Sequence, residues 1–180
     1  MIKTIVLAAA GLLALAVVVV LVLASRKPDT FSVHRSTAIK APPEKIYPLI
    51  ADFRNWGPWS PWEKKDPAMK RSFGGAESGK GATYAWEGNK DVGKGSMTLA
   101  DADPPRRVAL NLDFEKPFEA HNRVTFTLTP KGDSTEVAWS MEGPTPFIGK
   151  IVHVFVDMDR MVGGDFEAGL ANLKAAAEKS

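Results

Sequence analysis

Few residues of this chain have the types and spacing that enzyme chemistry requires. The three histidines, His34, His121 and His153, are far apart in the sequence, and none belongs to an H-E-x-x-H zinc motif. Cysteine is absent, so the chain has no thiol nucleophile, thiolate ligand or disulfide. The serines lack the flanking glycines of a nucleophile elbow. We therefore predict no metal site, no cofactor and no catalytic residue defined by a motif.

Isolated ionisable side chains remain as candidates for acid–base catalysis, which needs a group poised inside a cavity. Asp157, Asp159 and Asp165 lie in the last helical stretch, where acidic side chains usually face solvent. His153 stands beside apolar residues of that stretch and is the histidine expected nearest to a cavity, with a structural role as the simpler interpretation. Spacing selects none of the strand candidates, which are Tyr84, Asp113, Glu115 and Arg123.

One stretch imitates a nucleotide-binding motif. Gly74-Gly-Ala-Glu-Ser-Gly-Lys-Gly81 nearly spells the phosphate loop G-x-x-x-x-G-K-[ST], but Gly81 replaces the hydroxyl residue that binds Mg²⁺. A predicted strand follows this stretch, whereas a phosphate loop needs a helix N-terminus at that point. We therefore do not predict nucleotide binding.

The element expected to organise the domain is the stretch from Pro146 to Lys179. Its apolar residues are mostly three or four apart, from Ile148 to Leu173, which predicts a long amphipathic helix. The pair Gly163-Gly164 is expected to bend or loosen it, because each glycine costs about 1 kcal/mol relative to alanine in a helix interior. Such a helix has to bury its apolar stripe against a large partner.

That partner is predicted to be an antiparallel sheet. A strand over Phe31–Ile39 and a short helix over Glu44–Ala51 precede a series of alternating segments with short Gly- or Pro-rich joints, which is typical of a meander. The later strands are expected near 69–73, 82–87, 95–100, 108–114, 124–128 and 137–141. The sequence thus predicts an α+β domain whose sheet has one apolar face, covered by the last helix.

Three tryptophans, Trp56, Trp59 and Trp62, fall in the Pro- and Gly-rich stretch between the short helix and the meander. Proline and glycine exclude a long helix there and favour a tight turn carrying large aromatics. Two interpretations remain open: a hydrophobic lid that plugs one end of the core, or a ligand entrance. If exposed, these side chains also suit a membrane interface.

The N-terminus contains an uncharged apolar run from Ile5 to Ala24. Twenty helical residues span about 30 Å, the thickness of a bilayer's hydrocarbon core. The run is longer than the core of a cleaved signal peptide. We therefore divide the chain into a transmembrane anchor (or signal peptide) at 1–27, a linker at 28–30 and a domain at 31–180. The location predicted is the bacterial inner membrane, single-pass, with the side of the membrane left open because basic residues flank both ends.

Charge gives no reason to expect a nucleic-acid partner. Residues 1–27 hold three of the 23 basic residues and none of the 21 acidic ones, so the remainder carries 20 basic and 21 acidic side chains. A nucleic-acid-binding domain would present a basic face.

The chain resembles the START-like, or SRPBCC, superfamily of polyketide cyclase/dehydrase-like proteins over residues from about 31 to 178. The stretches that carry the resemblance are Ile39-Lys-Ala-Pro-Pro-Glu-Lys-Ile-Tyr47, Asp52-Phe-Arg-Asn-Trp56, Trp59-Ser-Pro-Trp62, Gly81-Ala-Thr-Tyr-Ala-Trp86, Gly93-Lys-Gly-Ser-Met97 and Gly164-Asp-Phe-Glu-Ala-Gly-Leu-Ala-Asn-Leu-Lys174. The resemblance implies the helix-grip fold, an antiparallel sheet wrapped around a long C-terminal helix. It also implies a cavity between sheet and helix for a lipid, sterol, polyketide or other apolar molecule.

The leading hypothesis is a membrane-anchored, non-catalytic binding domain for a hydrophobic small molecule or lipid. Small-molecule pockets are mostly apolar with a few polar groups. The residues predicted to line this one are Tyr84, Trp86, Met97, Leu110, Leu112, Phe126, Trp139, Ile151, Phe155, Met158 and Val162. Two alternatives remain: a cyclase/dehydratase-type enzyme on the same fold, and an envelope interaction module with a filled core.

Overall fold

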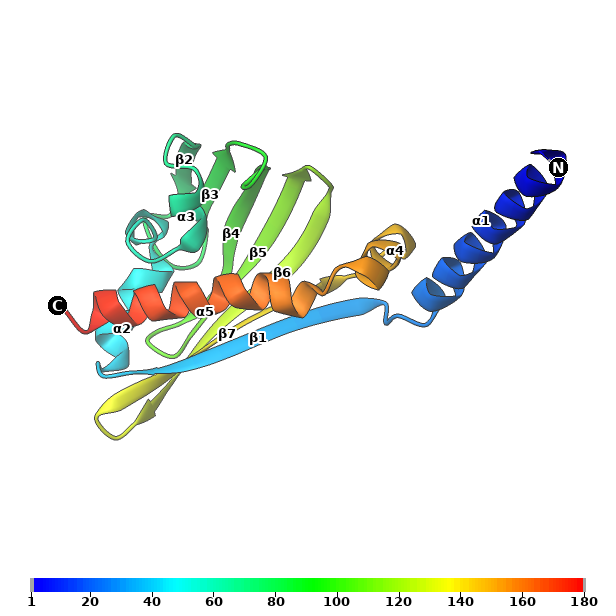
Figure 1. The fold of residues 1–180 in the computed structure, drawn as a ribbon. Coiled ribbons are helices and arrows are strands. Elements are labelled where there is room, and N and C mark those ends of the chain that lie inside the picture. Colours follow the sequence, from blue (N-terminus) through cyan, green and yellow to red (C-terminus); the bar gives the residue numbers. More distant parts are fainter. Residues whose placement is uncertain (1, 180) are drawn as a thin grey trace.

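The computed structural model describes residues 2–179, and its centre is a seven-stranded antiparallel sheet (Figure 1). The strands are β1 (Thr30–Ile39), β2 (Lys70–Gly75), β3 (Ala82–Glu87), β4 (Lys94–Asp103), β5 (Arg107–Lys116), β6 (Ala120–Lys131) and β7 (Ser134–Pro144). The helices are α1 (Ile2–Ser25), α2 (Pro43–Ala51), η1 (Phe53–Asn55), α3 (Pro61–Lys65), α4 (Phe147–Phe155) and α5 (Met158–Ala177). The predicted α+β helix-grip fold is confirmed, with strands longer than alternation alone indicated.

The strand order is β1-β7-β6-β5-β4-β3-β2. Strands β2 to β7 form the predicted meander, and β1 joins its far edge by pairing with β7. The register places Trp139 of β7 opposite Phe126 of β6, which in turn lies opposite Val108 of β5. Because side chains alternate between faces, these rows give the sheet one apolar inner face and one polar outer face.

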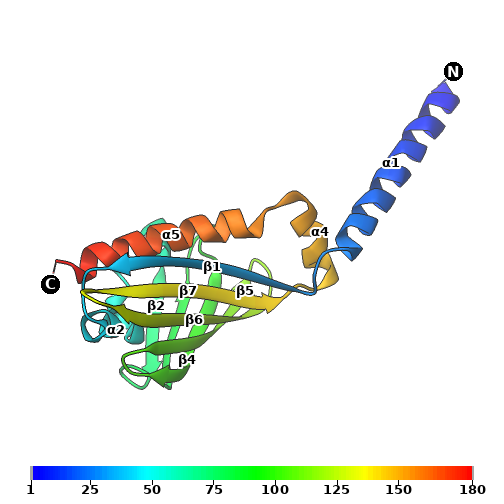
Figure 2. The ribbon, with the colours of Figure 1, turned by 90° about the horizontal axis from the view of Figure 1, so that it is seen from below.

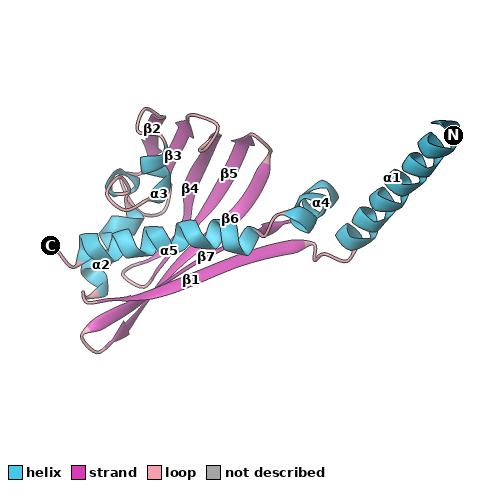
Figure 3. Ribbon diagram, in the orientation of Figure 1, coloured by secondary structure: helices cyan, strands magenta, loops and turns pink. Residues whose placement is uncertain are grey.

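The C-terminal stretch forms two helices rather than the single bent helix expected from the sequence. The break lies at Val156-Asp157, where the Asp157 carboxylate accepts a hydrogen bond from the Arg160 backbone N–H at 3.0 Å and caps α5. The glycine pair lies inside α5 and does not interrupt it. Figure 3 shows the loop that separates α4 from α5. The expectation of one helix was therefore wrong, because a capping carboxylate starts a second helix at Met158, six residues before the glycine pair ends.

Gly163 instead permits a close approach of α5 to β1. The Arg35 side chain rises from the inner face of β1 and lies where a Cβ at position 163 would stand. Its guanidinium donates to Asp159 at 3.0 Å and to Glu167 at 2.6 Å, both on α5. These ion pairs hold α5 alongside β1, as Figure 2 shows from below.

The N-terminal helix α1 projects away from the sheet (Figures 1 and 2). It is long and apolar enough to span a membrane, and most of its side chains are exposed. Its main contact with the domain is at α4, where Ala24 is buried. Only residues 26–29 separate α1 from β1, which begins at Thr30, one residue inside the predicted linker.

Candidate ligand-binding site

The three tryptophans close one end of the inner face. Trp56 and Trp59 are buried, and their indole N–H groups donate to the backbone oxygens of Ile50 and Leu49 at 3.0 and 2.9 Å. Trp62 is half-buried and meets the ring of Trp139 edge-on. These contacts make the segment part of the core at the α2 and α3 end. That it lines a ligand entrance stays a prediction.

The ring of Trp139 joins this cluster to α5. It stacks on Phe166 with ring centroids 4.0 Å apart and an interplanar angle of 10°, and it also meets the ring of Trp59 edge-on. Aromatic pairs of this kind add about 0.5–1.5 kcal/mol beyond the area that they bury. The C-terminal half of α5 is therefore fixed against the sheet by a continuous aromatic cluster.

A polar latch holds α3 over this cluster. Glu63 accepts hydrogen bonds from the Tyr84 hydroxyl and from Arg71 Nε, both at 2.6 Å. Burial and the Glu63 carboxylate raise the pKa of Tyr84 above its usual range. Lys65 also pairs with Asp165 of α5 at 2.7 Å. Through these contacts the cluster holds α3 against β2, β3 and α5.

The opposite end of the inner face is open. One row of inward positions crosses this end of the sheet. The register pairs Phe31 of β1 with Gly143 of β7, and Asn122 of β6 with Leu112 of β5. Gly143 lies next to Asn122, and a Cβ at position 143 would overlap the amide of Asn122. Phe31 and Leu112 are only partly buried, as are Phe114 and Val162, which also pack against the core. Apolar side chains therefore remain accessible from solvent on a face that is otherwise packed.

Asn122 is the polar member of this row and was missed by reasoning from the sequence. It is 8% exposed, and its Oδ1 is a buried acceptor without a hydrogen-bond partner among the described residues. Leaving such a group unpaired costs about 1–3 kcal/mol. The signal was available, because Asn122 has the same parity as Val124, Phe126 and Leu128 and therefore points inward. This oxygen lies over Gly143 and beside the Phe31 ring.

The residues predicted to line a cavity divide between the two ends. The strand residues all lie on the inner face, and all but Leu112 are buried; they are Tyr84, Trp86, Met97, Leu110, Leu112, Phe126 and Trp139. Of the helix residues, Ile151, Met158 and Val162 are half-buried at the open end. Phe155 is 72% exposed, because α4 diverges from α5. A ligand-binding role for this set stays a prediction.

The isolated carboxylates have structural partners. Asp157 caps α5, Asp159 pairs with Arg35, and Asp165 pairs with Lys65. On the strands, Glu115 pairs with Lys94 at 2.7 Å. The hydrogen bond to Arg35 holds the pKa of Asp159 below its usual range. Each of these carboxylates therefore has a basic or backbone partner within the fold.

The histidines occupy three different settings. His34 is exposed on the outer face of β1. His121, also exposed, contacts Asp113 Oδ1 at 2.7 Å, which raises the pKa of the imidazole. His153 meets the ring of Phe31 edge-on at 6.3 Å, and burial, together with Lys27, lowers its pKa. His153 therefore contacts an open-end side chain and is favoured there in its neutral form, whereas its approach to a cavity stays a prediction.

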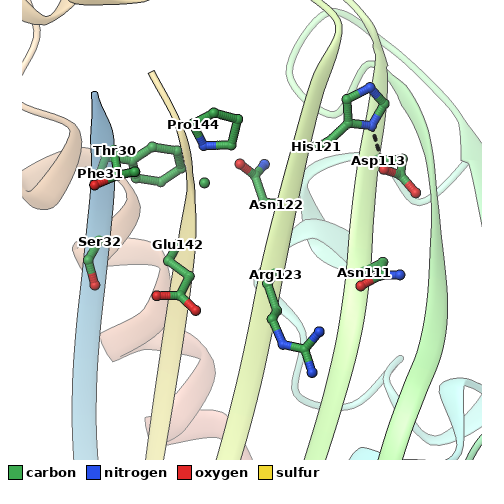
Figure 4. Close-up of a pocket in the computed structure, with 11 residues that line it drawn as sticks. Thr30, Phe31, Ser32, Asn111, Asp113, His121, Asn122, Arg123, Glu142 and Pro144 are labelled. Carbon is green, nitrogen blue, oxygen red and sulfur yellow. Dashed lines mark hydrogen bonds and ion pairs between the residues drawn. The ribbon is translucent and has the colours of Figure 1, made fainter. Parts of the chain in front are cut away.

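A hollow of about 510 Å³ lies at the same end, and its lining includes Phe31, Asn122 and Gly143 of the open-end row together with residues of the outer face (Figure 4). Ser32, Glu142, Arg123 and Asn111 form one row across β1, β7, β6 and β5 within it. A second pocket of about 270 Å³ lies near Pro42 and Pro130. Neither pocket contains a residue predicted to line a cavity. Among residues 2–179, no group of three or more His, Asp or Glu side chains is placed to hold a metal ion.

Comparison with known proteins agrees with this architecture. The family model described as polyketide cyclase / dehydrase and lipid transport matches residues 30–178. No match was found among curated proteins. Solved structures with the same fold include the Aha1 dimer of Colwellia psychrerythraea, with a TM-score of 0.54, 15% identity, and coverage of 80% of this chain and 96% of that one.

Two further structures extend the range of proteins with this fold. Major latex-like protein 151 of Panax ginseng gives a TM-score of 0.57 at 15% identity, covering 83% of this chain and 99% of that one. The di-domain ARO/CYC BexL of the BE-7585A biosynthetic pathway gives 0.59 at 13% identity, covering 87% of this chain and 52% of that one. At these identities the likeness establishes the fold alone.

Proposed function

Because the chain belongs to the polyketide cyclase/dehydrase and lipid transport family, we propose that it is a membrane-anchored binding protein for a hydrophobic small molecule or lipid, without catalysis. The ligand enters at the open end of the inner face, beside Phe31, Asn122 and Leu112. The helix α1 holds the domain at a bilayer.

The observation that carries this proposal is the combination of accessible apolar side chains with an unpaired buried amide. Phe31, Leu112, Phe114 and Val162 supply apolar contact, and Asn122 Oδ1 supplies a hydrogen-bond acceptor. A few oriented polar groups in an apolar site are typical of small-molecule binding. The ligand class that fits best is an apolar molecule with a hydroxyl donor, because that donor would satisfy the amide oxygen.

The enzyme alternative requires an acid or base that faces the ligand with a free proton site. His153 meets the Phe31 ring at the open end and has a lowered pKa, while Asp113, His121, Arg123 and Glu142 line the neighbouring hollow. Asp113 and His121 pair with each other on the outer face, away from the inward side chains of Phe31 and Leu112. The filled-core alternative is supported by the aromatic cluster at the α2 and α3 end, from which ring contacts continue through Tyr84 and Trp86 to Phe114. Against it, Phe31 and Leu112 remain only partly buried.

The test is native mass spectrometry on residues 28–180, purified without detergent, followed by extraction and identification of any bound molecule. Removing α1 leaves the sheet intact, because the main contact of α1 is with α4 and Ala24 is its buried residue. We expect a discrete apolar mass. An empty protein that also fails to enhance the fluorescence of the apolar dye 1,8-ANS would exclude ligand binding.

Two adjacent residues of β5 provide a matched pair of variants. Leu112 faces the open end, whereas Asn111 faces outward in the opposite register row. Leu112→Glu should abolish ligand binding, because it would place a carboxylate against an apolar ligand. The mass of the bound molecule should then be absent from the native mass spectrum. Asn111→Glu should retain the bound molecule. Circular dichroism of both variants verifies that each is folded, and equal retention by both would place the ligand elsewhere.

A further inference from the structure

We propose that α4 and the β5–β6 loop form a second membrane-contacting surface, which seats the open end of the inner face directly on a lipid bilayer. This inference rests on the proposed function in one respect, the insertion of α1. It adds a docking surface outside the anchor and a source for the ligand, which is the bilayer itself.

The helix α4 has its polar and apolar faces reversed relative to an ordinary surface helix. Lys150 is 9% exposed and its ammonium group pairs with Asp29 at 2.5 Å. By contrast, Ile148 is 70% exposed and Phe155 is 72% exposed, with Val152 exposed between them. A surface helix of a soluble protein buries its apolar stripe and exposes its charges. The stripe of α4 therefore points away from the domain and needs an apolar partner.

A second exposed aromatic lies at the same end of the molecule. Phe118, in the loop between β5 and β6, is 79% exposed. The antiparallel order brings together the start of β1, the end of β7 and the β5–β6 loop, since Thr30 pairs with Pro144 and Phe114 pairs with Ala120. The helix α4 follows directly from the end of β7. The exposed apolar side chains of α4 and of this loop thus border the open end.

The position of α1 identifies the partner as a bilayer. Its last turn packs on α4 and buries Ala24. Residues 26–29 reach at most about 14 Å when fully extended, and the Asp29–Lys150 pair fixes them to α4. When α1 spans a membrane, the surface of that membrane must therefore lie close to α4. The exposed Arg26 and Lys27 occupy the level of the headgroups, where cations favour anionic lipid.

An interfacial helix of this kind buries its apolar face about 5–10 Å into the boundary between headgroups and acyl chains. Seated in this way, α4 and Phe118 would shield the accessible side chains of Phe31 and Leu112 from water. An apolar ligand could then pass between the bilayer and the open end without crossing the aqueous phase. Direct exchange with the bilayer is the consequence that separates this arrangement from a domain tethered at a distance.

The experiment uses the full chain, reconstituted in phosphatidylcholine–phosphatidylglycerol vesicles. The natural sequence has no cysteine, so one introduced cysteine carries an NBD fluorophore at a single position. Phe118→Cys and Phe155→Cys report on the proposed surface, and Leu13→Cys reports on insertion of α1. The matched control is Asp133→Cys, at the exposed turn at the opposite end of β6 from Phe118.

We expect the labels at positions 118, 155 and 13 to shift to shorter emission wavelength and to lose fluorescence when the vesicles carry brominated acyl chains. The label at position 133 should do neither. Positions 118 and 155 are exposed, so labelling removes no core contact.

If the label at position 13 is quenched but the labels at positions 118 and 155 show neither a blue shift nor quenching, the docking surface is overturned. The anchor then stays in place. A blue shift at 118 and 155 without quenching would also overturn the docking surface, because a protein rather than lipid would then cover it. Loss of quenching at position 13 alone would instead remove the anchor from the proposed function. An absence of bound ligand in the mass-spectrometry test would leave all of these quenching results unchanged.

Discussion

The two ends of the inner face contain similar types of residue but differ in how fully their side chains are packed. At the α2 and α3 end, Trp59, Trp139 and Phe166 pack against one another, and the buried indole N–H groups of Trp56 and Trp59 have backbone partners, whereas Trp139 Nε1 has none among the described residues. At the α4 end, Phe31 and Leu112 stay accessible, and Asn122 Oδ1 has no hydrogen-bond partner among residues 2–179. Aromatic content and a single unpaired polar atom therefore occur at both ends, and the accessibility of Phe31 and Leu112 is what sets the open end apart.

The largest expected effect comes from breaking the closed end. Trp59→Ala should destabilise the domain by about 3–5 kcal/mol, the range for large aromatic truncations in a core. Urea denaturation of residues 28–180 measures it. The control at the open end is Phe155→Ala, which should change stability by less than about 0.5 kcal/mol because its side chain is exposed. Equal losses for the two variants would contradict the proposed difference between the ends.

The next effect concerns the clamp that joins α5 to β1. Gly163→Ala should destabilise the domain by about 1–3 kcal/mol, since its methyl group needs the space that the Arg35 guanidinium occupies. Gly164→Ala is the matched control: nothing lies within 4 Å of a Cβ there. That variant should gain up to about 1 kcal/mol from helix propensity. Thermal denaturation of both variants gives the comparison, and a stable Gly163→Ala variant would show that the clamp is dispensable.

A smaller effect, of opposite sign, is expected at the open end. Asn122→Leu removes an unpaired buried acceptor and keeps the shape of the side chain, so it should stabilise the empty domain by about 1 kcal/mol. The same variant should weaken binding of a hydroxyl-bearing ligand. Urea denaturation and ligand retention in native mass spectrometry measure the two consequences. A loss of stability would mean that the amide has a partner in solution, such as an ordered water molecule.

The smallest expected effect is a pH-dependent change in stability at His121, which lies on the outer face of the sheet. Asp113 raises the folded-state pKa of His121 above its unfolded value of about 6.5. The protonated imidazole is therefore favoured by folding. Its contribution is complete below about pH 6.5 and is lost as the pH rises through the raised pKa. Proton NMR titration measures the shift, and Asp113→Asn should lower the pKa of His121. An unchanged pKa would show that the contact does not persist in solution.

Much of the fold could be predicted because its signals are local. Alternation over Val108, Leu110 and Leu112 marks β5, and the same period marks β6 and β7. The uncharged run in front gives α1. The open end was predicted less well. Leu112 and Val162 were named, but Asn122 was not, because a polar residue on an apolar face acquires meaning only when its neighbours across the sheet are known.

The sequence by itself determined the period of each element, the order of the elements, the family and the apolar length of α1, because these depend on residues close together in the chain. The tertiary structure alone decided three other features: the break before α5, the use of Gly163 to admit Arg35, and the reversed faces of α4. Each depends on contacts between distant segments, such as Arg35 with Asp159 and Asp29 with Lys150. Periodicity reports which residues share a face of a helix, but only packing decides whether that face turns toward the core or away from it.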